Sequence, residues 1–76
     1  MGDDGREMGD AGVTVEGLQR DLATIGYRIS VTGVFDAATA AVVRAFQRRW
    51  RPMRVDGVGD VDTIVLANSV AALAAV

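Results

Sequence analysis

The densest group of side chains able to bind a ligand lies between residues 44 and 54. All eight basic residues of the chain are arginines, and five of them fall in this stretch. They are Arg44, Arg48, Arg49, Arg51 and Arg54, with Trp50 among them. Arginine can hold a carboxylate through two parallel hydrogen bonds, and an aromatic face can cover a sugar ring. A plainer interpretation also fits, in which Trp50 packs beside Phe46 in the core and the arginines form a solvated helix face.

Groups able to catalyse a reaction are scarce. The chain has no histidine and no cysteine, so the usual zinc ligand sets and the Ser-His and Cys-His pairs are unavailable. Two carboxylates could still serve a glycosidase. However, Asp36 and Asp60 are better explained as helix caps, and Glu16 and Asp21 lie early on a solvated helix. We expect no catalytic residue and no cofactor.

Calcium is the metal that the later acidic residues could suggest. Asp56, Asp60 and Asp62 do not follow the spacing of acids at places one, three and five of an EF-hand loop. Ala67 stands where the closing glutamate of such a loop would be. The sequence therefore predicts no metal site.

An eight-residue phrase occurs twice, as TGVFDAAT at residues 32–39 and as DGVGDVDT at residues 56–63. Asp36 and Asp60 stand directly before helical stretches, where a carboxylate can accept a backbone N–H of the first turn. The threonine three residues later could reach back to the backbone of the cap residue, as in a capping box. Glycine in second place suits a tight turn with positive φ. These threonines and glycines are Thr39, Thr63, Gly33 and Gly57.

Apolar spacing predicts three helices around these turns. The first carries Val15, Leu18, Leu22 and Ile25 at intervals of three and four. Thr14 is a candidate N-cap, and Gly26 is placed to end the helix in a left-handed conformation. The second helix runs from Ala37 to about Arg49, before Pro52 disfavours helical geometry at Arg51. Its inward residues, with Phe35 of the turn, are expected to be Phe35, Val42, Val43, Phe46 and Trp50.

The third helix begins near Val61 and carries Val65, Leu66, Val70 and Leu73, followed by alanine-rich sequence. Two of the three helices then start with the same turn. We predict an all-α fold, a compact three-helix bundle with a duplicated turn-helix unit.

Composition limits the chain to one small domain of 76 residues. Residues 1–12 carry four of the ten acids against one arginine, a net charge of −3, which leaves +1 for residues 13–76. We expect residues 1–12 to be a flexible acidic linker or tail and residues 13–76 to be the folded domain. No apolar run approaches the ~20 residues that a membrane span needs, and we recognise no signal peptide.

The stretches LQRDLATIGYRISVTGVFDAATAAVVRAFQ and VDGVGDVDTIVL resemble the peptidoglycan-binding-domain-like family of three-helix modules. The family's ordered pattern falls on Leu18, Gln19, Leu22, Gly26, Tyr27, Gly33, Phe35, Thr39, Val43, Phe46, Gln47, Asp56, Gly57 and Thr63. Asp36 and Asp60 replace a glycine that many members have before these helices. The sequence RRWRPMRVDG departs from the usual Phe-Gln-Gly-Leu continuation and resembles the C-terminal domain of N-acetylmuramoyl-L-alanine amidases.

The resemblance implies a noncatalytic module that binds bacterial peptidoglycan and targets an attached cell-wall hydrolase, such as an amidase. It implies the bacterial cell envelope, either periplasm or cell wall, as the location, and we expect a monomer. Candidate ligand-binding residues are Tyr27, Arg48, Trp50, Arg51 and Arg54. Tyr27 could equally be a packing residue, and Gln47 is expected to bond the backbone of a neighbouring loop.

Two other functions remain open at this stage. An arginine-rich helix beside a turn can enter a nucleic-acid groove, although a net charge of +1 over residues 13–76 is low for such a module. Alternatively, the domain could dock on a catalytic domain and shape its cleft. The sequence NSVAALAAV has alanine and valine on several helix faces, which a partner could cover.

Overall fold

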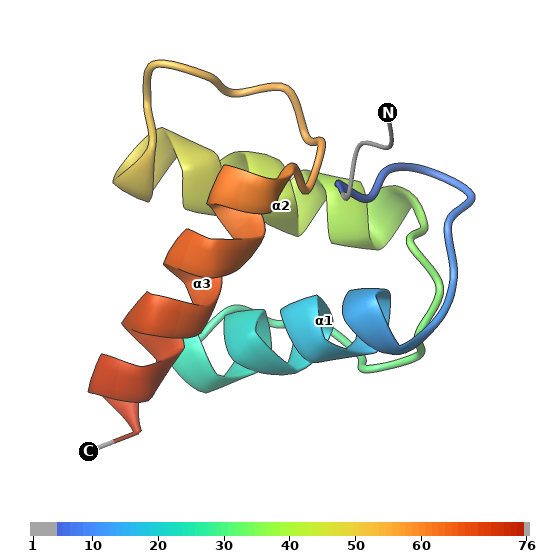
Figure 1. Cartoon of the computed structure of the whole chain (residues 1–76), viewed down its shortest axis with the longest axis horizontal. Coiled ribbons are helices and arrows are strands. Elements are labelled where there is room, and N and C mark those ends of the chain that lie inside the picture. The colour runs from blue at the N-terminus through green and yellow to red at the C-terminus, as the bar shows by residue number, and fades with distance from the viewer. Residues whose placement is uncertain (1–4, 76) are drawn as a thin grey trace.

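The computed structural model describes residues 5–75, and these residues form three α-helices and no strand. The helices are α1 (Val13–Ile25), α2 (Ala37–Trp50) and α3 (Val61–Ala74). α1 and α2 lie one below the other, and α3 crosses beside them at a steep angle (Figure 1). α1 contacts both of the other helices. The predicted all-α three-helix bundle is confirmed.

One apolar cluster lies between the three helices, and every element contributes to it. Its buried members are Val15, Leu18, Leu22, Phe35, Ala40, Val43, Phe46 and Ala67. Phe35 belongs to the turn before α2, not to a helix, and fills the space between them. Val42, predicted to face inward, is partly buried against this cluster. Burying a residue of this kind contributes about 1.5–3 kcal/mol, so a small core of this size leaves the fold sensitive to single losses.

The start of α1 differs from the prediction. Thr14 is not the N-cap, because α1 begins at Val13 and its N-cap is Gly12, with φ +130° and no side-chain cap bond. The Gly12 amide donates to the Gly33 carbonyl at 2.8 Å, which fixes the chain as it enters the helix. A tertiary hydrogen bond therefore sets this helix start. The end follows the prediction, since α1 stops at Ile25 and Gly26 has φ +124°.

The most buried residues of α3 are small, whereas two of its large apolar residues are exposed. Val65 and Leu73 are 59% and 77% exposed, whereas Thr63, Ala67 and Ala71 are buried. These three residues are four apart, so they form one stripe of the helix. Their small side chains allow α3 to approach α1 closely. The prediction was wrong for Val65 and Leu73, whereas Leu66 and Val70 are partly buried against the core. Apolar residues lie on several faces of α3, so size did not identify the inner face.

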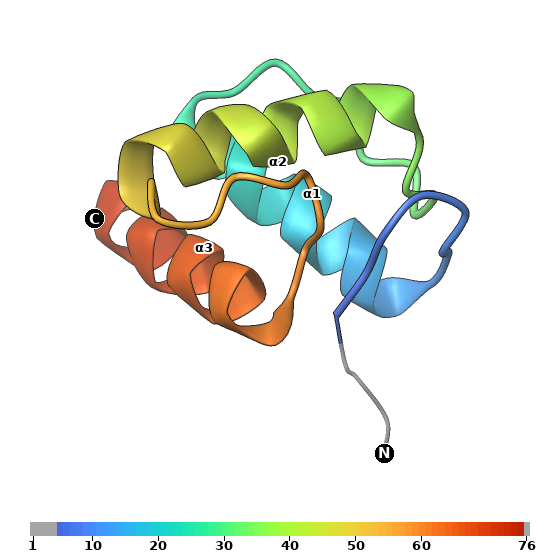
Figure 2. The same ribbon diagram turned by 90° about the horizontal axis from the view of Figure 1, so that it is seen from above.

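Residues 5–12 lie along the outside of both turns, and their backbone is hydrogen bonded to each (Figure 2). Arg6 and Gly59 exchange two backbone hydrogen bonds of 2.6 and 2.7 Å. Farther along, the amide of Phe35 donates to the carbonyl of Asp10 at 2.8 Å. Residues 1–4 of the expected linker lie outside the described residues. The boundary between residues 12 and 13 stays a prediction.

Candidate ligand-binding surface

Each of the two repeated turns is organised around one buried glutamine. The Oε1 atom of Gln19 accepts the amides of Thr32 and Gly33, both at 2.8 Å. Its Nε2 atom donates to the Val34 carbonyl at 3.0 Å and to the Thr39 hydroxyl at 2.9 Å. A buried amide side chain is costly unless its donors and acceptor are satisfied. Gln19 therefore fixes the first turn, residues 32–36, against the start of α2.

Gln47 repeats this arrangement at the second turn, residues 56–60. Its Oε1 atom accepts the amides of Asp56 and Gly57 at 3.1 and 3.0 Å. Its Nε2 atom donates to the Val58 carbonyl at 2.9 Å and to the Thr63 hydroxyl at 3.2 Å. The prediction that Gln47 bonds a neighbouring loop is confirmed. The equal role of Gln19 was missed, although each glutamine follows a core leucine or phenylalanine and precedes one copy of the repeated phrase.

The two aspartates of the repeat cap helices as predicted. Oδ1 of Asp36 accepts the Thr39 amide at 2.9 Å, and Oδ1 of Asp60 accepts the Thr63 amide at 2.8 Å. The backbone and hydroxyl of Thr39 together lower the pKa of Asp36, because both donate to its ionised form. The glycines in second place, Gly33 and Gly57, have φ of +80° and +77°, as predicted.

The threonine hydroxyls do not reach the cap backbone, as a capping box would require. The Thr39 hydroxyl instead donates to the Asp36 carboxylate at 2.9 Å. The Thr63 hydroxyl accepts from the Gln47 amide and from Arg51. Each threonine hydroxyl also accepts a hydrogen bond from the buried glutamine of its turn. The three-residue spacing between aspartate and threonine was predicted correctly, but the hydroxyl bonds were not.

Arg51 closes the second turn by an ion pair with the cap residue. Its NH1 atom lies 2.7 Å from both Asp60 oxygens and 3.1 Å from the Thr63 hydroxyl. NH2 lies 3.2 Å from Oδ2 of Asp62. Burial opposes ionisation of Asp60, but hydrogen bonds from Arg51 and Thr63 outweigh it and lower the pKa of Asp60 to about 2. The same hydrogen bond raises the pKa of Arg51.

Arg54 also faces acids of its own chain. Its Nε atom donates to Oδ2 of Asp56 at 3.0 Å, and NH1 lies 3.6 Å from Oδ2 of Asp60. The Val58 amide and Arg54 lower the pKa of Asp56 against the effect of burial. Arg51 and Arg54, both predicted ligand contacts, therefore serve the fold. Because Arg54 stays 58% exposed, it keeps a solvent-facing side.

Two of the other predicted site residues, Tyr27 and Trp50, contact the ring of Phe46. Tyr27 meets this ring edge-on, with centroids 6.4 Å apart, and Trp50 lies tilted against it, also at 6.4 Å. Trp50 is 41% exposed, so it is neither the core residue of the plainer interpretation nor free of the core. The guanidinium carbon of Arg49 lies 5.3 Å from the Trp50 ring centroid, a cation–π contact that the sequence did not single out.

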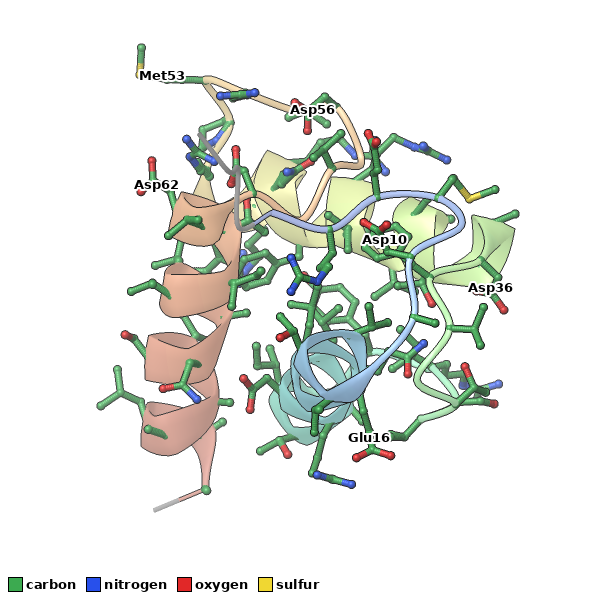
Figure 3. All side chains as sticks on the ribbon, turned by 45° about the vertical axis from the view of Figure 1, so that its right-hand side comes forward. Asp10, Glu16, Asp36, Met53, Asp56 and Asp62 are labelled. Atoms are coloured by element: carbon green, nitrogen blue, oxygen red, sulfur yellow. The ribbon has the colours of Figure 1, made fainter. Side chains whose placement is uncertain are left out.

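Arg48, the last of the predicted residues, is exposed near the end of α2. We call Tyr27, Arg48, Arg49 and Trp50 the aromatic edge. Trp50 and the partly buried Tyr27 supply aromatic surface, and the exposed Arg48 and Arg49 are cations that can attract a carboxylate. Met53 extends from the loop after α2 and is 97% exposed (Figure 3).

A separate hollow opens at the start of α2. Asp36, one of its wall residues, lies on the other side of the molecule from Met53 (Figure 3). The hollow has a volume of about 490 Å³. Its walls are Arg28, Ile29, Ser30, Thr32, Asp36, Ala38 and Thr39. Within residues 5–75 no cluster of side chains suited to a metal ion occurs. No helix in that range is long and apolar enough to cross a membrane.

Comparison with known proteins places the chain beside peptidoglycan-binding domains. The family model described as "Putative peptidoglycan binding domain" matches residues 11–66. The fold is similar to the crystal structure of a fused Zn-dependent amidase/peptidase/peptidoglycan-binding domain-containing protein from Clostridium acetobutylicum ATCC 824, with a TM-score of 0.81 and 30% identity. The match covers 88% of this chain and 30% of that protein, so the chain spans less than a third of its length. No curated protein matches the chain.

Proposed function

This chain belongs to the peptidoglycan-binding domain family, whose model covers most of it, and we propose that it binds bacterial peptidoglycan and holds a wall hydrolase at its substrate. The observation that carries the proposal is the family match over both glutamine-centred turns. The similar solved protein joins such a domain to a Zn-dependent amidase/peptidase. That similarity supports an amidase as the enzyme to be targeted, and the cell envelope as the location.

The module itself is noncatalytic in this proposal. Among the described carboxylates, Asp36 and Asp60 cap helices, and Asp56 pairs with Arg54. An acid held by such hydrogen bonds has a lowered pKa, which is the opposite of what a general acid needs at neutral pH. The benefit to an attached enzyme comes from effective concentration, because a weakly held module keeps its partner near the polymer.

The aromatic edge is the binding surface that we propose for the glycan. Trp50 is 41% exposed with the Arg49 guanidinium over its ring, and Tyr27 adds a second, partly buried ring. Arg48 is exposed on the same helix, two residues before Trp50, and we include it as a candidate partner for a carboxylate. Arg51 plays a smaller part than expected, since its guanidinium is already held by Asp60 and Asp62.

Sedimentation with insoluble peptidoglycan tests this proposal through three variants. We expect Trp50→Ala to weaken binding about tenfold, because a half-buried aromatic ring is the kind of residue that dominates a small interface. Arg48→Glu should weaken it less, and more at low salt than at high salt. Arg20→Glu, which reverses an exposed arginine of α1, is the matched control and should bind normally. Binding unchanged by both edge variants, with the fold intact, would remove the aromatic edge from the site.

Docking on a catalytic domain is the second candidate, and the outer face of α3 supports it. Val61, Val65 and Leu73 are exposed on this helix, although the core beneath it is complete. Docking and wall binding are compatible, because α3 and the aromatic edge are different surfaces. Leu73→Gln should loosen the docked domain in the full-length protein and leave sedimentation with peptidoglycan unchanged.

Nucleic-acid binding receives little support from the structure. Arg51 and Arg54 are paired with acids of the same chain, which reduces the free positive charge of the arginine cluster. Binding to phosphates requires several free cations and is strongly salt-dependent. Retention on heparin with a steep salt dependence would favour this alternative over the wall.

A further inference from the structure

The two turns differ in one respect that their shared sequence does not reveal. In the second turn, the cap carboxylate of Asp60 and the Thr63 hydroxyl together hold the guanidinium of Arg51. In the first turn, Asp36 and Thr39 stand in the same places and make the same cap bond. The first turn has no arginine to match Arg51.

Two alignments of the repeats are possible, and in neither does an arginine correspond to Arg51. Aligned on the turns, Arg51 corresponds to Tyr27, and aligned on the glutamines it corresponds to Ala23. Arg54, which also approaches Asp60, corresponds to Ser30. The first turn therefore has small or neutral residues where the second turn supplies two cations.

A hollow lies at the start of α2, beside this turn. Ser30, Asp36 and Thr39 are among its walls, at the places where Arg54, Asp60 and Thr63 stand in the second turn. Asp36 binds the Thr39 amide and hydroxyl through Oδ1. No ion pair of Asp36 occurs among residues 5–75, so its second oxygen can accept a further donor.

Arg28 gives the hollow a positive wall opposite in charge to Asp36. It is exposed, and within the described chain it forms no ion pair with Asp36 or any other acid. An acid and an arginine that share a hollow without pairing suit a group that carries both charges. An ammonium would bind Asp36 and a carboxylate would bind Arg28, the latter through two parallel hydrogen bonds.

We propose that this hollow binds a zwitterionic amino-acid group, with Asp36 and Thr39 receiving its ammonium and Arg28 its carboxylate. The proposal rests on the proposed function, since the stem peptides of peptidoglycan are its source of such groups. The ammonium takes the place that the Arg51 guanidinium takes in the second turn. Ser30 and Thr32 line the rim and can bond the peptide beyond it.

Titration of the whole chain, followed by amide NMR shifts, tests the proposal with three small probes. The probes are meso-2,6-diaminopimelic acid, pimelic acid, which lacks both ammonium groups, and 1,5-diaminopentane, which lacks both carboxylates. We expect diaminopimelic acid to shift the amides of Ser30, Thr32 and Thr39. The other two probes should bind at least about tenfold more weakly, since each loses one charge-assisted bond.

Two variants and a control identify the residues responsible. Asp36→Asn keeps a good N-cap but removes the charge, and it should weaken diaminopimelic acid binding about tenfold. Ser30→Arg introduces the cation that Arg54 supplies in the second turn, and it should block the hollow while the fold persists. Glu16→Gln removes one exposed carboxylate of α1 and should bind the probe normally.

Several results would overturn the proposal. These are shifts confined to residues outside the hollow, equal binding of pimelic acid, or full binding by Asp36→Asn with an unchanged spectrum elsewhere. Sedimentation of the chain with peptidoglycan under any of these results would leave the proposed function standing and remove the hollow from it. Probe binding in the hollow without sedimentation would keep the amino-acid site and contradict the proposed function.

Discussion

At the scale of single residues, the fold depends on two buried glutamines more than on any charged side chain. Gln19 and Gln47 are almost fully buried, and each satisfies two backbone amides and a carbonyl of its turn. These backbone groups have their hydrogen-bond partners inside the protein. The glutamine side chain supplies the partners that a neighbouring strand or helix turn would otherwise supply.

Replacing Gln47 by alanine should destabilise the chain severely. The amides of Asp56 and Gly57 would lose their acceptor inside the protein, at a cost of about 2–4 kcal/mol for the group of bonds. Urea unfolding of Gln47→Ala measures this cost. Asn68→Ala, which removes an exposed amide side chain with one bond of 3.3 Å to Asp21, is the control and should change the free energy of unfolding by less than about 0.5 kcal/mol. Similar midpoints for the two variants would contradict the role of the glutamine.

The ion pair at Asp60 makes stability depend on pH in the acidic range. The pKa of Asp60 falls from 3.8 to about 2 on folding, so the folded state binds its proton less readily than the unfolded state. The stabilisation is therefore complete above pH 3.8 and is lost as the pH falls toward 2. We expect a contribution of about 1–2 kcal/mol, reduced by solvent around this partly screened pair.

Urea midpoints measured between pH 5 and pH 2 on the wild type and on Asp60→Asn test this dependence. Asparagine keeps the cap acceptor and removes the titrating charge. The variant should be less stable than the wild type at pH 5 and should lose less stability on acidification to pH 2. Parallel curves for the two proteins would show that Asp60 is not responsible.

At the scale of elements, most helix boundaries could be predicted, because local chemistry sets them. Asp36 and Asp60 start helices, and Gly26 and Pro52 end them, all within a few residues of sequence. The start of α1 could not be predicted, since it depends on the Gly12–Gly33 bond between distant residues.

The buried face of α3 also could not be predicted from the sequence. A helix with apolar residues all around it has no sequence signal for its buried side. The structure resolves this by placing alanines inward. Ala67→Leu should then overpack the contact with α1 and cost about 1–3 kcal/mol, whereas Leu73→Ala should change stability by less than about 0.5 kcal/mol. Thermal unfolding of both variants checks the assignment, which the reverse order of stability would refute.

Residues 5–12, which their composition predicted to be a linker, are hydrogen bonded to both turns. Their contacts use backbone atoms, so they leave no apolar pattern to detect. We predict that the amides of Phe35 and Gly59 are protected from hydrogen exchange by the carbonyls of Asp10 and Arg6. Removal of residues 1–10 should speed exchange at both and leave unchanged the Ala40 amide, which donates to the carbonyl of the cap residue Asp36. Equal exchange of the Phe35 and Gly59 amides with and without residues 1–10 would indicate that this segment is a flexible linker.

At the scale of the whole molecule, the two turns have related sequences but different surroundings. The second turn is closed by Arg51 and Arg54 from its own chain. All of the aromatic edge except Tyr27 lies at the end of α2, directly before these arginines. The first turn leaves a hollow with an acid and an arginine. The sequence predicted the repeat and the aromatic and basic residues. It could not predict which arginines are used internally, because the pairing of Arg51 with Asp60 and Asp62 depends on how the intervening loop folds back.

Noncatalytic binding to the wall is tested by incubating the purified chain with insoluble peptidoglycan and measuring both bound protein and released soluble fragments. We expect saturable binding, absent with an inert polymer such as cellulose, and no fragments above the background of buffer. A chain that stays wholly in the supernatant at low salt, or one that releases fragments, would contradict this expectation.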